Sequence, residues 1–247
     1  MKCPAVFLTG TDTAGISLYG REIRAVPVQV ESRRLEDRVL TLSGKVVVRV
    51  DALSCNYRDR SLILQGTDPQ AVHRGPANEP SLTAFGSEFC GTVLAASPDC
   101  RLTPGQRVMA CSAYPESAEG AAPGVVTNTA SRGVLLVHES QLVAVPSWMT
   151  TPQAAAFGLC HQTAAAMIRR SGVGPQSQVL VTAATSSTSM AVRHQLQAIG
   201  ASCWVVSSKP DTPLLPNERR HPGLEDPAAT EIRVSHVIDP FWDLNLA

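Results

Sequence analysis

The sequence has no excess of charge of either sign, because 21 Lys and Arg residues balance 21 Asp and Glu residues. Such a chain lacks the field that attracts nucleic acid or an anionic membrane. It contains no apolar run near the roughly 20 residues that a membrane span requires, and its amino-terminal apolar stretch is too short for a secretory signal. We therefore expect a cytoplasmic globular protein that binds a small molecule, with no nucleic-acid or membrane partner.

Paired cysteines are missing as well. The sequence has no C-x-x-C pair and no Cys/His group at metal-ligand spacing, because its seven cysteines are scattered: Cys3, Cys55, Cys90, Cys100, Cys111, Cys160 and Cys203. Free cysteine is among the most frequently buried residues. We expect reduced, mostly buried thiols and no disulfide framework.

The sequence does contain two successive regions with different residue patterns. The first, up to about residue 150, consists of short β segments bounded by Gly, Pro, Ser or Asp, with one helical candidate at Tyr57–Gly66. This pattern is typical of a mostly antiparallel barrel or sandwich. The clearest strands are Gly44–Leu53, Glu88–Ser97, Gly105–Cys111, Arg132–His138 and Gln141–Pro146.

The second region begins with an Ala-rich helix that has Thr151 as N-cap, Pro152 at its first position and Gly172 beyond its end. Strand, helix and strand then alternate, which predicts a parallel sheet with two covered faces. Five prolines in Lys209–Thr230 leave little room for a crossover helix, so we expect a long loop there. The predicted elements are the strand Gln178–Ala183, the helix Ser187–Ile199 and the strands Ser202–Ser208 and Arg233–Asp239.

Several phrases, in order, make the chain similar to a known family. They are "NYRD" at 56–59, "GSEFCGTV" at 86–93, "LTPGQRVMA" at 102–110, "AAAFGLCHQTA" at 154–164, "GPQSQVLVTAAT" at 174–185 and "HVIDP" at 236–240. The chain resembles the medium-chain dehydrogenase/reductase superfamily, within it the zinc-independent quinone oxidoreductases and the enoyl reductases of polyketide synthases. The resemblance implies a mixed β and α/β fold, with a GroES-like β-barrel at 1–150 and a partial Rossmann domain at 151–247 that binds NADPH.

The resemblance also implies that no zinc is bound. Zinc-using members have Cys, His and Cys where this chain has Asn56, Ser87 and Leu159. Asp59 and Glu88 remain, and two hard oxygens do not make a tetrahedral zinc site. We expect no metal.

Without a metal, hydrogen bonds must polarise the substrate, and the resemblance assigns that catalytic role to Asn56 and Tyr57, with Arg58 and Asp59 ordering the loop as a pair. Asn56 and Asp59 are equally what simple capping of the following helix selects. For Glu88 we expect a bond to Arg58 or to backbone amides.

The predicted phosphate-binding turn has lost every glycine. The family turn resembles "GASGGVG", whereas residues 183–189 read "AATSSTS". Added Cβ atoms prevent close approach and penalise positive φ, yet hydroxyls at a helix N-terminus can themselves donate to phosphate. The turn therefore either binds pyrophosphate through its hydroxyls or is a self-capped helix start; the candidate residues are Ser186, Ser187, Thr188 and Ser189.

The end of the second strand predicts which dinucleotide is preferred. An NAD-selective fold carries an acidic residue there, whereas this chain has Ser207, Ser208 and Lys209, which favour NADPH. The resemblance further assigns a nicotinamide contact to Thr163. His161 is either a packing residue or a proton relay.

The predicted Rossmann portion, with three recognisable strands, is shorter than the six-stranded domain of the family, and an unfinished sheet exposes an edge that proteins usually cover. Two functions remain open: a zinc-independent NADPH-dependent reductase of an enone, quinone or carbonyl within a biosynthetic pathway, or a catalytically inactive dehydrogenase-like docking subunit. We expect a second copy, a partner chain, or the proline-rich loop together with residues 240–247 to cover the edge. A docking segment is predicted in that last stretch, with ordinary core packing as the alternative; its apolar residues are Phe241, Trp242, Leu244 and Leu246.

Overall fold

The computed structural model describes residues 1–10, 15–18, 20–67, 82–112, 125–223 and 231–240. The chain divides into two compact units, Met1–Leu159 and Cys160–Ala247, each described below by itself. Antiparallel sheets make up the first unit and a parallel sheet the second, so the mixed β and α/β class expected from the sequence is confirmed. The predicted domain division at residue 150 stays a prediction, and the predicted docking segment lies outside the described residues.

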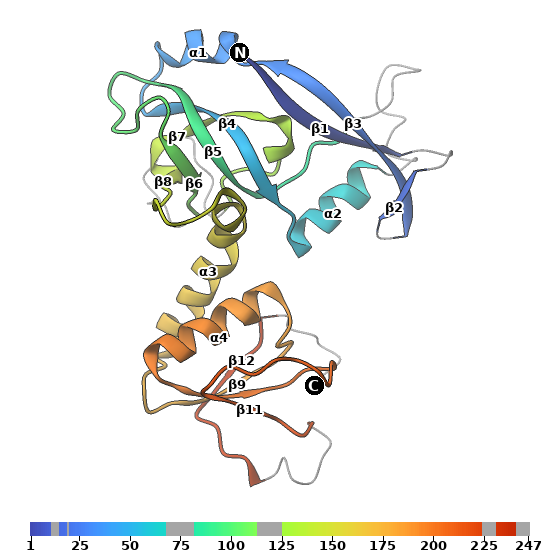
Figure 1. Ribbon diagram of the computed structural model, residues 1–247, viewed down its shortest axis with the longest axis vertical. Coiled ribbons are helices and arrows are strands. Elements are labelled where there is room, and N and C mark those ends of the chain that lie inside the picture. The colour runs from blue at the N-terminus through green and yellow to red at the C-terminus, as the bar shows by residue number, and fades with distance from the viewer. Residues whose placement is uncertain (11–14, 19, 68–81, 113–124, 224–230, 241–247) are drawn as a thin grey trace. The chain divides into compact units, whose positions relative to one another are not determined.

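Two antiparallel sheets form the first unit (Figure 1). One has the order β1-β3-β2 and the other the order β7-β4-β5-β6-β8, with the short 3₁₀ helices η2 (Ala130–Arg132) and η3 (Glu139–Gln141) flanking β7. The strands are β1 (Lys2–Gly10), β2 (Ile16–Leu18), β3 (Arg21–Glu31), β4 (Lys45–Ser54), β5 (Glu88–Ala96), β6 (Arg107–Ala110), β7 (Val134–His138) and β8 (Leu142–Ala144). All five strands predicted for this half are present.

The strand β4, an interior strand of the five-stranded sheet, has buried residues on both faces. Val46 and Val48 pack with Phe89 in the main core of the unit, while Val47 packs with Val39 in a second cluster. Because neighbouring strand residues point to opposite faces, this division follows from the consecutive valines of β4. The covered second face explains why this segment is continuously apolar.

Two helices precede the long connection to the second unit. The helix α2 (Tyr57–Gly66) has the predicted bounds. A second helix, α1 (Arg33–Val39), was not expected, because Tyr57–Gly66 was the one helical candidate in this half. Within α1 only Val39 is buried, so its charged sequence carries almost no apolar period by which to recognise it.

The helix α3 (Thr151–Ser171) continues from the first unit into the second. The predicted N-cap at Thr151 is wrong by one residue. Thr150 O accepts a bond from Ala154 N at 2.9 Å, and Thr150 N and Oγ1 donate to Gln153 Oε1 at 3.0 and 2.9 Å. Thr150 therefore caps the helix, and Gln153 completes the arrangement three residues later.

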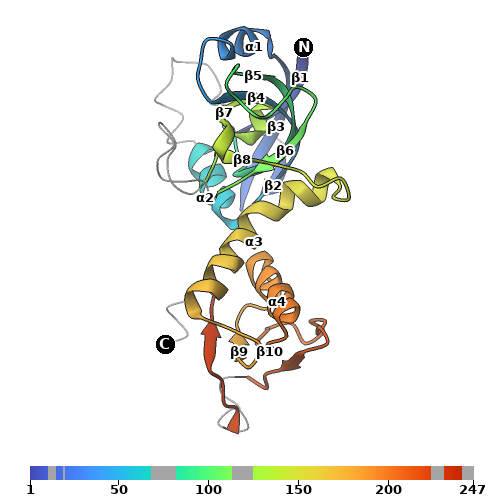
Figure 2. The same ribbon diagram turned by 90° about the vertical axis from the view of Figure 1, so that its left-hand side faces the viewer.

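The second unit is built on a four-stranded parallel sheet of order β11-β10-β9-β12. Its elements are β9 (Gln178–Val181), α4 (Ser187–Ile199), β10 (Ser202–Val205), β11 (Glu218–Arg220) and β12 (His236–Ile238). The helix α4 lies along one face (Figure 2), where Val192 and Leu196 share a core with Val181 and Val205. The predicted strands are present but end earlier than expected.

The strand β11 corrects the prediction for the proline-rich segment. Only three strands were expected in this half, and Lys209–Thr230 was assigned to a loop, yet Glu218–Arg220 pairs in parallel with β10. No helix occurs in residues 206–217, all of which are described, so the crossover from β10 to β11 is a loop with turns. A strand of three polar residues gives no periodic apolar signal, which is why the sequence did not reveal it.

Candidate functional site

The first candidate site lies where β4 ends and α2 begins. Asn56 occupies the N-cap position of α2, and its backbone N donates to Asp59 Oδ2 at 2.7 Å. Asp59 in turn has its own backbone N bonded to Asn56 O at 2.9 Å. The capping role that the sequence left open is therefore present in the structure.

Asp59 is fully buried, and its carboxylate binds the two residues that precede β5. Its Oδ1 accepts from Gly86 N at 3.0 Å and its Oδ2 from Ser87 Oγ at 3.0 Å. A buried carboxylate needs such donors to offset its desolvation. The expected pairing of Arg58 with Asp59 is wrong, because Arg58 Nε donates instead to Asn128 Oδ1 at 3.1 Å.

Glu88 is a second buried carboxylate, with 3% of its surface exposed. Its Oε1 accepts from Ser54 Oγ at 2.5 Å and from Asn56 Nδ2 at 3.0 Å, and its Oε2 accepts from Leu159 N at 2.7 Å. Of the two partners expected for Glu88, the backbone amide is the one found. Ser54 is a member of this cluster that sequence reasoning missed, and its place at the end of β4 was the only signal for it.

Tyr57, the other predicted catalytic residue, is largely exposed, at 67%. Arg60 lies 5.6 Å from the centre of its ring and donates to its hydroxyl at 3.4 Å. The neighbouring Cys55 is also exposed, and partial desolvation together with the charge of Asp59 raises the pKa of its thiol. Cys55 is therefore a poor thiolate nucleophile at neutral pH.

The donors of this site are committed to one another. Asn56 and Ser87 stand where the resemblance expects metal ligands in zinc-using members, and both bond to buried carboxylates. Within the described part of the chain, no three His, Cys, Asp or Glu side chains group so as to hold a metal ion. The set of atoms that remains is one of hard oxygens and an amide, which does not suit zinc.

The second candidate site begins with the turn between β9 and α4. Ala183 has φ = 46°, and among the described residues it is the one non-glycine with positive φ. By the resemblance drawn from the sequence, this residue corresponds to the first glycine of the phosphate-binding turn. The backbone therefore keeps the left-handed conformation that a glycine would adopt without strain.

Two hydroxyls of the turn are used within the chain. Ser186 is the N-cap of α4, where its Oγ accepts from Ser189 N at 3.2 Å and donates to Ser189 Oγ at 2.9 Å. Ser189, which is fully buried, donates from Oγ to Thr182 O at 2.9 Å. Ser189 thus ties the helix to the end of β9, in the place where the family glycine allows helix and strand to approach.

The other two predicted residues of the turn face outward. Ser187 is exposed and Thr188 is half-buried, both in the first turn of α4. First-turn amides have no partner inside their own helix, and the helix dipole favours an anion there. The structure therefore separates the four predicted residues into two that stabilise the turn and two that are available to a ligand.

The end of the neighbouring strand β10 carries a folded polar loop. Ser207 Oγ accepts from Lys209 N at 3.1 Å and from Thr212 Oγ1 at 2.7 Å, while Ser208 and Lys209 are exposed. Arg220, at the end of β11, donates to Lys209 O at 3.3 Å and to Thr212 O at 2.8 Å. Sequence reasoning missed Arg220, because it lies in the unrecognised strand.

Because β9 and β10 are parallel neighbours, the turn after β9 and the loop after β10 lie at the same edge of the sheet. Thr182, at the end of β9, also donates from Oγ1 to Asp239 Oδ1 at 2.7 Å, next to the end of β12.

Of the two predicted residues on α3, Thr163 is exposed, and the backbone carbonyl of His161 accepts from Gln195 Nε2 at 3.0 Å.

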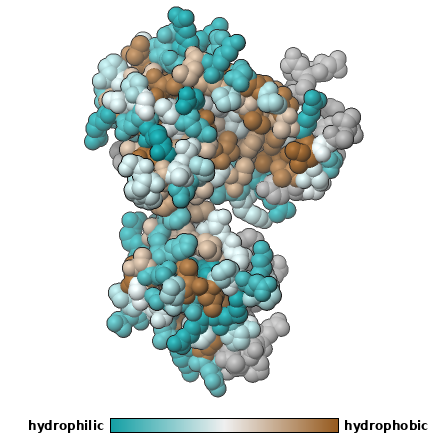
Figure 3. Space-filling model, in the orientation of Figure 1, coloured by the Kyte–Doolittle hydropathy of each residue, from teal (hydrophilic) through white to brown (hydrophobic). Residues whose placement is uncertain are grey.

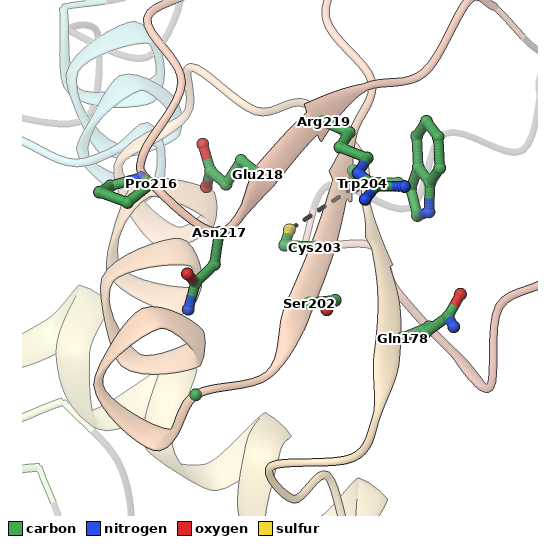
Figure 4. Close-up of a pocket in the computed structure, with 9 residues that line it drawn as sticks. Gln178, Ser202, Cys203, Trp204, Pro216, Asn217, Glu218 and Arg219 are labelled. Atoms are coloured by element: carbon green, nitrogen blue, oxygen red, sulfur yellow. Dashed lines mark hydrogen bonds between the residues drawn. The ribbon is translucent and has the colours of Figure 1, made fainter.

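A cavity of about 300 Å³ lies at the opposite edge of this sheet (Figure 4). Gln178, Ser202 and Glu218 on its wall are the first residues of their strands. Ligands of open α/β sheets bind outside the carboxyl ends of the strands. This cavity is therefore separate from the second candidate site.

A second cavity, an apolar groove of about 250 Å³, lies in the first unit between β1 and β4. Figure 3 shows apolar residues gathered on this part of the visible face. Its wall includes Val6, Val50, Leu53 and Ala130. The carboxylate of Asp51 there is bonded to Arg49 and Thr92.

Comparison with known proteins agrees with this geometry. Residues 42–151 match the alcohol dehydrogenase GroES-like domain family. No curated protein matches the chain. None of the helices in the described part of the chain combines the length and hydropathy needed to cross a bilayer.

Solved structures share the fold at low identity. The quinone oxidoreductase of Pseudomonas syringae pv. tomato DC3000 is 22% identical, with a TM-score of 0.55 over 84% of this chain and 54% of that one. The CurK enoyl reductase is 20% identical (TM-score 0.56; 83% and 54%). The Escherichia coli quinone oxidoreductase complexed with NADPH is 17% identical (TM-score 0.54; 82% and 52%). The chain thus spans about half the length of these relatives.

Proposed function

We propose that this chain, which has the fold of the quinone oxidoreductases and enoyl reductases of the medium-chain dehydrogenase/reductase superfamily, is a zinc-independent NADPH-dependent reductase of an enone, quinone or carbonyl. We further propose that it acts in the cytoplasm, within a biosynthetic pathway. When bound, NADPH supplies a hydride to the electrophilic carbon of such a substrate.

The observation that carries the proposal is the backbone of Ala183. A left-handed residue at the first position of the turn is costly for Ala, by about 1 kcal/mol or more, and yet φ is 46°. Ordinary helix capping by Ser186 does not require this conformation three residues earlier. A turn that keeps the phosphate-binding backbone after losing its glycines supports dinucleotide binding.

The residues at this edge suit NADPH. The first-turn amides and hydroxyls of Ser187 and Thr188 would hold the pyrophosphate, with Ser186 and Ser189 fixing the turn around them. Ser207, Ser208 and Lys209 would bind the 2′-phosphate, because no carboxylate stands there to repel it. Arg220 holds the loop that presents them. Thr163 is proposed to contact the nicotinamide amide.

A second candidate is a catalytically inactive docking subunit. Two observations favour it: the hydroxyls of Ser186 and Ser189 are bonded within the turn, and Nδ2 of Asn56 is bonded to Glu88. We propose for either function that a second copy or a partner chain covers the β12 edge of the sheet, where Val237 is 61% exposed.

Calorimetric titration of the chain with NADPH and with NADH tests the cofactor proposal. We expect tighter binding of NADPH, and loss of that preference in Lys209→Glu, because the substitution places a carboxylate beside the 2′-phosphate. Lys2→Glu, at the start of β1, makes the same charge change far along the sequence in the other unit and serves as the control. Equal affinity of the unmodified chain for the two cofactors contradicts the proposal.

A further inference from the structure

The carboxylate of Glu88 accepts hydrogen bonds at both of its oxygens and thereby links the N-terminus of α2 to α3. One carboxylate oxygen accepts from Asn56 and Ser54, and the other accepts from Leu159 N within α3. A carboxylate held at both oxygens cannot rotate to release one partner without breaking the bond to the other. With 3% exposure it is also out of reach of competing water.

The close approach of α3 that this bond needs is built into the sequence. A Cβ at Gly158 would lie 2.8 Å from Ala110 O and 3.5 Å from Glu88 Oε2. Only glycine therefore lets α3 come near enough for Leu159 N to reach the carboxylate. The amide donates at position 159, well inside a helix that begins at Thr151.

The chemistry of the bond decides the orientation of Asn56. An ionised carboxylate only accepts hydrogen bonds, so it must face the nitrogen of the Asn56 amide and not the oxygen. The two hydrogens of Nδ2 then lie toward Glu88 at 3.0 Å and Ser54 Oγ at 3.5 Å. The carbonyl oxygen of the amide is left to accept from the backbone N of Asp59 in the capping box of α2.

We propose that Glu88 is a positioning residue that fixes the Asn56 amide with its nitrogen inward, so that both Nδ2 protons are directed into this cluster and Asn56 does not serve as an oxyanion donor. In the reduction proposed above, on which the meaning of this orientation rests, Tyr57 is then the side-chain donor of the pair. The exposed hydroxyl of Tyr57, with Arg60 beside it, suits that role.

Nitrogen-15 labelling of asparagine tests the orientation without any turnover or cofactor. The chain has five asparagines, and Asn56→Ala assigns the side-chain signal of interest. We expect the Asn56 Nδ2 protons to exchange about 10-fold or more slowly than in the urea-unfolded chain, because they are bonded within a partly buried cluster around the buried carboxylate of Glu88. In Glu88→Gln this protection should fall at least several-fold and the Leu159 amide signal should move, while Glu22→Gln, an exposed site on β3, changes neither.

Ser54→Ala keeps the proposal open to refutation if Glu88→Gln does not fold. Without the Ser54 hydroxyl, Asn56 Nδ2 no longer shares Glu88 Oε1 with a second donor. The protected Asn56 proton should therefore persist, and its resonance should shift further downfield. Unprotected Asn56 protons in the unmodified chain, or protection unchanged in folded Glu88→Gln, would overturn the inference. Either result is independent of NADPH titration, which alone decides the proposed function.

Discussion

At the scale of single residues, Ala183 has the most direct energetic consequence. Its φ of 46° costs an L-residue about 1–2 kcal/mol. Glycine would avoid this strain, but the greater conformational entropy of the unfolded chain would offset part of the gain in stability. We expect Ala183→Gly to raise the free energy of unfolding by about 0.5–1 kcal/mol in urea titrations. Ala183→Val should lower it.

Ala165→Gly provides the matched control for this prediction. Ala165 is exposed inside α3, where φ is helical, so the same substitution should lower stability by about 1 kcal/mol. If Ala183→Gly were as destabilising as Ala165→Gly, the turn would not hold a left-handed residue.

The thiols of Cys203 and Cys55 should differ sharply in reactivity. Burial, then the charge of Glu218, raises the pKa of Cys203 to about 12, and 3% of the residue is exposed. Cys55 is exposed, with its pKa raised by desolvation and by Asp59. Because the thiolate is the reactive form, a raised pKa slows alkylation at neutral pH.

We therefore expect iodoacetamide to modify Cys55 slowly and to leave Cys203 untouched in the folded chain, as mass spectrometry of peptides will report. Below its pKa, the rate at Cys55 should rise about tenfold per pH unit with the thiolate fraction. Both should react alike in urea. Rapid alkylation of folded Cys203 would show that β10 is not buried as described.

At the scale of elements, no helix connects β10 to β11 in residues 206–217. A buried ion pair holds β11 against α4 instead. Arg193 of α4, 1% exposed, donates from Nε and Nη2 to the two oxygens of Glu218 on β11, at 2.7 and 2.6 Å. It also donates to Ala184 O at 2.8 Å and Pro213 O at 2.6 Å. One guanidinium thus fastens the turn after β9, the loop before β11 and the edge strand β11 to α4.

We expect Arg193→Met to destabilise the second unit by about 3–5 kcal/mol, because it leaves the carboxylate of Glu218 buried without its partner. The double variant Arg193→Met/Glu218→Leu should be more stable than Arg193→Met alone, since no buried charge remains. Chemical denaturation of the two single variants and the double variant gives the coupling. Additive effects would mean that the pair does not act as a unit.

At the scale of the whole molecule, the described sheet would provide one half of the proposed dinucleotide site. A doubly wound fold holds its cofactor between two mononucleotide-binding halves, whereas the described residues contain a single set of four parallel strands. The chain also spans about half the length of the solved relatives. Productive hydride transfer tolerates little displacement, since about 1 Å can cost 100-fold in rate.

We therefore expect this chain by itself to bind NADPH weakly and to show negligible turnover. The measurement is the loss of NADPH absorbance with a panel of quinones and α,β-unsaturated carbonyls. Activity should appear when a longer chain or a partner provides the remaining strands. Robust turnover by this chain alone would mean that the serine- and threonine-rich turn is a complete phosphate site.

The sequence by itself determined the elements whose signals are local. A run of β-branched valines specified β4, the Tyr57–Gly66 pattern specified α2, and the apolar period after Ser186 specified α4 with its bounds. The colinear motifs also predicted the GroES-like domain and the parallel sheet. These features follow from periodicity and capping, which neighbouring residues decide among themselves.

The tertiary structure alone decided what depends on residues far apart in the sequence. The strand β11 exists because β10 pairs with it and Arg193 neutralises Glu218, although its three polar residues carry no strand signal. The orientation of Asn56 is likewise imposed by Glu88 and through it by Leu159, 71 residues beyond Glu88. A buried charge takes its partners from whatever the fold brings near, and no local pattern reports which partners those are.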